Sequence, residues 1–316
     1  MPPSHPHLLT PYLHLPQYSL TVLTSVLGAT SNWLVLRYLH AALSSSFKDA
    51  DSGGIGEVAG RKRKVVLVSF LRGWAFWRAE TRRLGLDLNR LVNENRLSFV
   101  DGVSGLFPIE EQSRGLQSSA RPSAANAPCL APKANHVKLQ WKANEGLNKI
   151  EKDIVAAIDQ LKTQAADGDD EILLIVDQPD LLLSATGMKD GTGATQMEDL
   201  ILGLRSHVHS SIVTLSADFP LVQTTSLGEP HPQTPLEQAH SSFLIWMAHQ
   251  ATLVLQLRNL DTGVAKDVSG VLRISRGGSA GDALLGNGEQ EQKWEENEYL
   301  YFVQGDGGVR VFGRGE

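Results

Sequence analysis

The chain has 316 residues, of which 41% are hydrophobic and 20% are charged, a composition typical of a globular protein with a sizeable core. Its formal net charge is -6 and its pI is about 5.9, so no global positive field draws it to nucleic acid or to an acidic membrane. The single cysteine, Cys129, excludes an intrachain disulfide and a cysteine-based zinc site, and it fits a reducing, intracellular compartment.

The N-terminal stretch MPPSHPHLLTPYLHLPQ has no basic region followed by an apolar core, so the sequence predicts no signal peptide. Its prolines interrupt helices, and we expect a flexible N-terminus over 1–17. The longest apolar runs elsewhere are about as long as a strand, so we expect a soluble protein that does not contact membranes.

Three segments rich in small and polar residues cannot bury enough apolar surface to offset the entropy lost on ordering them. We therefore expect a single domain over 1–316 with disordered or loop inserts near 44–62, 110–135 and 277–293. The sequence contains no internal repeat.

Between these inserts, strand and helix patterns alternate. Continuous apolar runs such as VVLVSFL are typical of strands buried on both faces, and apolar residues three and four apart indicate helices. Predicted strands span 18–26, 65–71, 96–101 and 210–218, and another begins the segment 171–184. Predicted helices span 32–43, 73–95 with an interruption at Gly85, 145–164, 197–209 and 237–250. The tail predicts strands joined by turns at 251–260, 270–278, 298–304 and 307–314.

Alternating strand–helix units imply a parallel sheet with helices on both faces, and the closing strands imply an antiparallel extension. The sequence therefore predicts an α/β domain with a RecA-like, mostly parallel central sheet and antiparallel strands at its C-terminal edge. A ligand of such a domain binds at the carboxyl ends of the parallel strands.

An ATPase on this plan needs a loop after the first strand, with glycines that let the backbone approach phosphate and a lysine for the outer phosphates. The segment at that position reads Gly28-Ala29-Thr30-Ser31-Asn32, followed by Trp33. It lacks a second glycine and the lysine. We consider a degenerate nucleotide loop and an ordinary strand-to-helix turn capped by Ser31 or Asn32, and we favour the turn.

The acid that orders magnesium in such a site follows an apolar strand, and Asp177 in ILLIVD is the Walker-B-like residue here. Because this pattern is common, we favour a turn-capping role for Asp177, and we expect Asp180 to cap the next helix. No carboxylate to orient water follows VVLVSF, where the chain reads LRGW, and Asp101 has no phosphate to serve. We therefore expect no ATP hydrolysis by this chain alone, no catalytic residue and no cofactor.

Other catalytic and metal sites are not indicated. His207 and His209 are two apart at the end of a predicted helix, so they point to different faces and do not share a metal ion. The G-x-S-x-G motif of Ser/His/Asp hydrolases is absent, and Cys129 lies in a predicted insert.

A basic run precedes the strand at 65–71, and arginines downstream extend it. We favour a solvated loop end or a gatekeeper against aggregation for this run; the functional alternatives are phosphate contacts for RNA and a nuclear-import patch. The candidate RNA contacts are Arg61, Lys62, Arg63, Lys64 and Arg72. Further downstream, Arg78, Arg82 and Arg83 could extend the patch.

Several segments resemble the family of the sixth Elongator subunit. They are VVLVSFLRGWAFWRAETRRLGLDL, LSFVDGVSGLF, ILLIVDQPDLLLSATG, NLDTGVAKDVSGVLRISRGG and EYLYFVQGDGGVRVFGRG. The resemblance covers roughly 18–315 apart from the inserts, and the segment at 259–278 is the most specific.

The resemblance implies a RecA-like fold without working Walker motifs, in a six-membered ring with the fourth and fifth Elongator subunits. It implies a ring that works with the Elongator core subunits, binds tRNA and supports modification of the wobble uridine U34. The chemistry resides in another, acetyl-CoA- and radical-dependent subunit. We expect a cytoplasmic protein with a nuclear pool.

We hypothesise that Trp74 and Trp77, on one face of the helix GWAFWRAE, form part of a ring interface; the alternative is that they belong to the core. Two other functions remain open. One is an ATPase whose atypical nucleotide site is completed by a neighbouring subunit. The other is a recombinase-like regulator that binds DNA, against which the acidic pI weighs.

Overall fold

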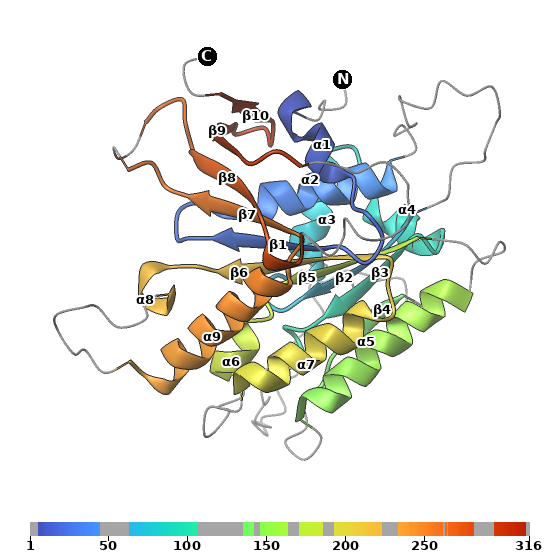
Figure 1. Cartoon of the computed structure of the whole chain (residues 1–316). Helices are drawn as coiled ribbons and strands as arrows, with labels where there is room; N and C mark the ends of the chain where they lie inside the picture. Colours follow the sequence, from blue (N-terminus) through green and yellow to red (C-terminus); the bar gives the residue numbers. More distant parts are fainter. Residues whose placement is uncertain are drawn as a thin grey trace, which may run out of the picture.

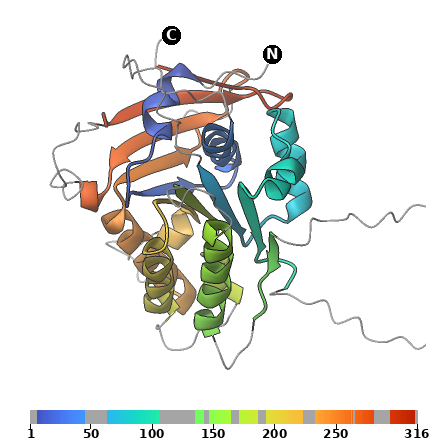
Figure 2. The same ribbon diagram turned by 90° about the vertical axis from the view of Figure 1, so that its right-hand side faces the viewer.

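The structure is a computed structural model that describes residues 6–44, 63–105, 135–141, 146–163, 171–185, 193–222, 233–261, 263, 265–280 and 294–313. The described chain forms three layers, with one ten-stranded sheet between two layers of helices (Figures 1 and 2). This architecture confirms the predicted α/β fold.

The sheet has the strand order β10-β9-β8-β7-β1-β6-β5-β2-β3-β4. From β7 to β4 all neighbouring strands are parallel, and β7, β8, β9 and β10 pair in antiparallel fashion. The strands are β1 (Leu20–Ser25), β2 (Lys64–Ser69), β3 (Leu97–Asp101), β4 (His136–Lys138), β5 (Ile172–Asp177), β6 (Ser210–Ser216), β7 (Leu253–Arg258), β8 (Gly270–Arg276), β9 (Asn297–Val303) and β10 (Val309–Phe312). The antiparallel extension at the C-terminal edge is therefore as predicted.

Helices α1, α2, α3 and α4 cover one face of the sheet, and α5, α6, α7 and α9 cover the other (Figure 1). They are α1 (Thr10–Leu13), α2 (Asn32–Leu43), α3 (Trp74–Arg83), α4 (Leu88–Asn93), α5 (Gly146–Thr163), α6 (Leu181–Ala185), α7 (Gly193–Arg205), α8 (Phe219–Val222) and α9 (Pro235–Gln250), with 3₁₀ turns η1 (His7–Leu9) and η2 (Gly278–Ala280).

The continuous apolar strands pack against both helix layers, because successive side chains point to opposite faces of a sheet. In β2, Val65 and Leu67 pack in the core under α2 and α3, while Val66 and Val68 pack in the core over α5 and α7. Strand β2 is thus buried on both sides, which explains why its sequence shows no alternation with polar residues.

The predicted interruption of the 73–95 helix is confirmed at Gly85. This residue has φ +78°, a conformation that glycine adopts without the strain of a side chain. The side chain of Asp87 then starts α4 by accepting hydrogen bonds from the amides of Asn89 and Arg90, at 3.0 and 3.4 Å.

The N-terminal stretch differs from the flexible segment expected over 1–17, because its described part is folded onto the domain. Leu9, Tyr12 and Leu13 are buried, and the Tyr38 hydroxyl donates to the Tyr12 carbonyl at 3.0 Å. Pro11 lies in the first turn of α1, where a missing amide hydrogen breaks no helical bond.

The predicted inserts lie mostly outside the described residues. At their edges, Asn135 is buried and leads into the short strand β4, which the sequence analysis missed. The beginning of the third insert forms η2.

Candidate functional site

A ligand of this fold is expected where neighbouring strands β1 and β6 send the chain to opposite faces of the sheet. From β1 the chain enters α2 on one face, and from β6 it reaches α9 on the other (Figure 1). The final residues of the two strands, Ser25 and Ser216, are direct partners in the parallel register. The loops that follow them therefore meet at one place, and this meeting point is the candidate site.

The loop after β1 is held by side chains of this chain. The Leu27 amide donates to Asp218 Oδ1 at 2.8 Å, and the Asn259 side-chain amide donates to the Leu27 carbonyl at 3.0 Å. Gly28 has φ +92°, and a Cβ there would lie 3.2 Å from the Asn259 side chain. The carboxylate of Asp218 thus lies where a phosphate-binding loop would present a free amide.

The start of α2 confirms a strand-to-helix turn but not its predicted cap. Ser31 occupies the N-cap position without a side-chain hydrogen bond to the helix, and its buried hydroxyl has no partner. The buried Oδ1 of Asn32 is also unpaired. Thr30 is exposed, whereas Ala29 and Trp33 are buried.

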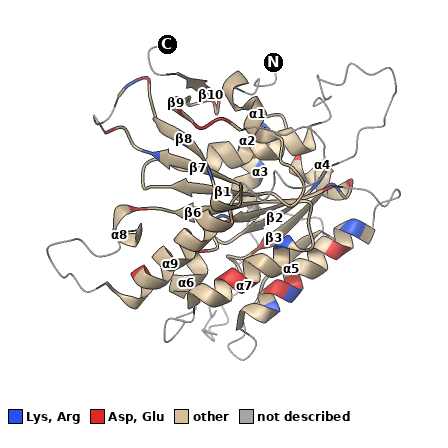
Figure 3. Cartoon of the chain, viewed as in Figure 1, with Lys and Arg blue, Asp and Glu red and all other residues tan. Residues whose placement is uncertain are grey.

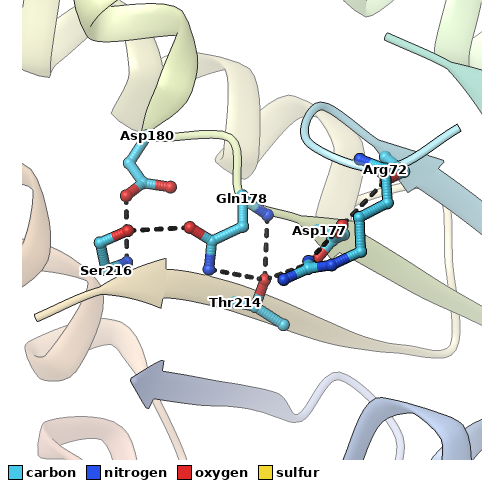
Figure 4. A network of polar contacts seen from close by, with 7 residues as sticks. Arg72, Asp177, Gln178, Asp180, Thr214 and Ser216 are labelled. Carbon is cyan, nitrogen blue, oxygen red and sulfur yellow. Dashed lines mark hydrogen bonds and ion pairs between the residues drawn. The ribbon is translucent and has the colours of Figure 1, made fainter. Parts of the chain in front are cut away.

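The Walker-B-like residue Asp177 is fully buried at the end of β5. The register places it directly between Ser69 of β2 and Thr214 of β6. The Ser69 and Thr214 hydroxyls donate to its carboxylate at 2.8 and 3.1 Å. The Arg72 guanidinium donates to Oδ1 and Oδ2 at 2.9 and 3.1 Å (Figure 4). Both carboxylate oxygens are therefore occupied by donors of the chain itself.

Burial raises the pKa of Asp177 above its usual value of 3.8, and Arg72, Ser69 and Thr214 oppose this shift. Arg72 therefore supplies the positive charge that a magnesium ion supplies beside such an acid in an ATPase. Neither the turn-capping role favoured for Asp177 nor a free metal-binding carboxylate describes this ion pair. Asp177 is recognisable from the sequence pattern, whereas its partner Arg72, from the segment LRGW, is not.

The polar network continues from Asp177 toward α9 (Figure 4). Gln178 has φ +56°, and its backbone amide donates to Thr214 Oγ1 at 2.9 Å. Its side-chain Oε1 accepts from the Ser216 hydroxyl at 2.8 Å. Asp180 Oδ2 accepts from the Ser216 amide at 3.0 Å and lies 3.2 Å from His240 Nε2. Asp180 thus ties β6 to α9, rather than capping the next helix as predicted.

Two residues of the basic run are described, and both have internal partners. Arg63 Nε lies 2.9 Å from Glu171 Oε2, and the buried Lys64 ammonium donates to the Leu161 carbonyl at 2.9 Å. The Arg72 side chain is 14% exposed and pairs with Asp177. These geometries argue against phosphate contacts at Arg63, Lys64 and Arg72.

Arg61 and Lys62 lie outside the described residues, so their proposed RNA contact stays a prediction. Downstream in α3, Arg82 and Arg83 are exposed. Acidic and basic residues alternate along α5, so that helix presents no uniformly basic face (Figure 3). Helix α5 is therefore not a candidate for a basic RNA-binding face.

The proposed interface tryptophans belong to the core, which corrects the interface hypothesis. Trp74 is 8% exposed, and its ring centroid lies 5.2 Å from that of Phe99. Trp77 is completely buried and meets Phe76 edge to face at 5.3 Å. Both rings are used inside the chain and are not available to a neighbouring subunit.

Within the described ranges, no group of three or more His, Cys, Asp or Glu side chains is arranged to hold a metal ion. In the same part of the chain, no helix combines the length and apolar character needed to cross a membrane.

Two comparisons bear on the family. The family model described as Elongation complex protein 6 matches residues 60–301, a span that contains both Arg72 and Asp177. The Elongator complex protein 6 homolog of Schizosaccharomyces pombe is 23% identical over 300 residues, which cover 95% of this chain and 92% of that protein.

Proposed function

The chain belongs to the Elongation complex protein 6 family, and we propose that it acts as a non-catalytic subunit of an Elongator complex. One observation carries the proposal. The groups that would contact nucleotide and magnesium in an ATPase are already bound to side chains of this chain. Asp177 binds Arg72, and the Leu27 amide binds Asp218. A nucleotide at this place would have to break both contacts.

The proposal includes assembly with the fourth and fifth Elongator subunits into a hexameric ring. Large apolar side chains at the candidate site support it, since Leu27 is 86% exposed and Phe219 is 73% exposed. Asp218 joins the two loops that carry them. Leu71, after β2, adds a third side chain at the carboxyl edge of the sheet and is 47% exposed. Apolar side chains of this size suit an interface with another protein.

The ring would bind tRNA and, together with the Elongator core subunits, support modification of the wobble uridine U34. With a net charge of -6, this chain would contact RNA through a local basic surface or leave that contact to its partners. We further propose that it works in the cytoplasm, with a nuclear pool.

Co-purification with the fourth and fifth subunits tests the assembly. Leu27→Glu and Phe219→Glu place charges at the proposed interface and should release the chain from the ring while its melting temperature stays near wild type. Leu202→Glu, on α7 and 45% exposed in the free chain, is the matched control and should remain in the ring. Retention of both edge variants would place the interface elsewhere.

The non-catalytic role has its own test. A ligand that binds only the folded state raises the melting temperature. Because we expect the isolated chain not to bind magnesium–ATP, its melting temperature should stay unchanged when magnesium–ATP is added. A rise that disappears in an Asp177→Asn variant would instead favour the atypical ATPase.

A further inference from the structure

A pocket of about 400 Å³ lies between the first half of α2, helix α3 and the turn that joins β9 to β10. Its walls include the aromatic side chains of Trp33, Phe76 and Tyr301 and the guanidinium-bearing Arg37. This volume lies in the range of small-molecule sites. The pocket borders the loop before α2, because Gly28, Thr30 and Asn32 line it. Neither Arg72 nor Asp177 lines it, although the Arg72 guanidinium lies 5.5 Å from the centre of the Phe76 ring in its wall.

Arg37 is the unusual residue of this pocket. Its side chain is 1% exposed, and its Nη2 donates to the Gly307 carbonyl at 3.2 Å. Its Nε and Nη1 are buried without a hydrogen-bond partner. Within the described residues, Arg37 forms no ion pair with a carboxylate. Unpaired buried donors of this kind are strongly destabilising unless an acceptor meets them.

The start of α2 points to the same kind of partner. This helix has 12 residues, no side-chain cap and no acidic residue in its first turn, so its own side chains do not offset the positive end of its dipole. Its first turn carries Asn32 and Trp33, which line the pocket. An anion there would meet the helix N-terminus as well as Arg37.

The other charged residues that line the pocket leave its net charge positive. Glu80 and Arg83 both line the pocket, but they pair with each other at 3.4 Å. The buried charge of Arg37 is therefore not neutralised by Glu80.

We propose that this pocket binds a small organic anion that carries a carboxylate or a phosphate group on a flat ring. The ring lies among Trp33, Phe76 and Tyr301, of which Trp33 and Tyr301 already contact each other with centroids 5.0 Å apart. The anionic group faces Arg37 and the start of α2. A ligand oxygen replaces the Gly307 carbonyl at the guanidinium, which exchanges a neutral acceptor for a charged one.

The ligand requires the turn at 304–308 to move as a unit, because the hydrogen bonds from Gln304 N to Gly308 O at 2.8 Å and from Gly307 N to Gln304 O at 3.0 Å close it. It contains Gly305, Gly307 and Gly308, and Gly307 has φ +88°. A Cβ built at Gly305 would meet nothing within 4 Å, so this part of the turn has open space around it. Movement of the turn frees Arg37 Nη2 from the Gly307 carbonyl.

Thermal-shift and calorimetric titration of the full chain test the proposal with benzoate and phenyl phosphate as probes. At least one should bind and raise the melting temperature, and the two probes distinguish a carboxylate site from a phosphate site. Phenol has the ring without the anionic group, and inorganic phosphate has the anionic group without the ring. Each should bind roughly tenfold more weakly or not at all.

Arg37→Met removes the charge at similar length and should weaken the better probe by roughly tenfold or more, whereas Arg90→Met, on the exposed surface of α4, should not. If Arg37→Met does not fold, Thr30→Trp provides a second variant, because it places a large ring at the exposed rim of the pocket. No binding of either ring-bearing anion, or equal binding by wild type and the pocket variant, would overturn the proposal.

Discussion

One guanidinium nitrogen of Arg72 contacts both carboxylate oxygens of Asp177, at 2.9 and 3.1 Å, inside a site where Asp177 is completely buried. The two residues are 105 positions apart in the sequence. The contact joins the segment after β2 to the end of β5 and leaves neither carboxylate oxygen free for a metal ion.

Replacing Arg72 by Leu should destabilise the chain strongly, because Asp177 would then be a buried carboxylate without its cation. We expect a loss of about 3–5 kcal/mol in the free energy of unfolding, measured by urea denaturation. Arg90→Leu is the matched control, since its exposed pair with Glu94 should contribute less than about 1 kcal/mol. In Arg72→Leu/Asp177→Asn, part of the loss should be recovered, and strict additivity would contradict a direct pairing.

The raised pKa of Asp177 predicts how stability depends on pH. Between the usual value of 3.8 and the raised folded value, the folded chain holds more protons at this carboxyl than the unfolded chain does. The contribution of Asp177 to stability therefore falls as the pH rises through this window and is constant above it. Urea titrations should show the stability difference, wild type minus Asp177→Asn, decreasing over that window. A difference that increases with pH would mean that Arg72 and the hydroxyls outweigh the desolvation of the carboxylate.

The buried tryptophans predict loss of folding rather than loss of a partner. Trp77→Ala should lower the free energy of unfolding by about 3–5 kcal/mol, because it opens a cavity in the core beside α3. Phe219→Ala, at an exposed position, should leave this free energy nearly unchanged. Denaturant unfolding of the isolated chain measures both. A Trp77→Ala chain as stable as wild type would restore the interface hypothesis for this face.

The basic run should divide into two kinds of residue. If the ring binds tRNA through this run, Arg61→Ala/Lys62→Ala should weaken binding and reduce its dependence on salt, because phosphate contacts release counterions. Lys64→Met should instead act on stability, since the Lys64 ammonium is bound to the Leu161 carbonyl. Filter binding at several salt concentrations checks the first expectation. An unchanged salt dependence in the double variant would assign the tRNA contact to other residues or subunits.

The fold followed from local patterns because each strand and helix carries its own periodicity. The apolar runs of β2 and β5 and the amphipathic spacing of α5 needed no knowledge of their neighbours. The short strand β4 and the helix α1 were missed because they are held by tertiary contacts. The Tyr12 hydroxyl, for example, donates to the carbonyl of Glu295, 283 positions away.

The site could be predicted only in part. The loop at Gly28 and the acid at Asp177 are recognisable by position, since both follow a strand. Their partners Asp218, Asn259 and Arg72 are ordinary residues that acquire a role when the sheet places them together. The buried state of Arg37 was equally unforeseen, because an arginine in a helix pattern is normally read as exposed.

We propose that internal contacts of this chain occupy the place of a nucleotide site and that the chain serves as an assembly subunit. Native mass measurement of the chain co-expressed with the fourth and fifth Elongator subunits, with and without tRNA, tests it most directly. We predict a stable hetero-hexamer that gains the mass of tRNA when tRNA is added. A chain that stays monomeric beside these partners and hydrolyses ATP would contradict the account.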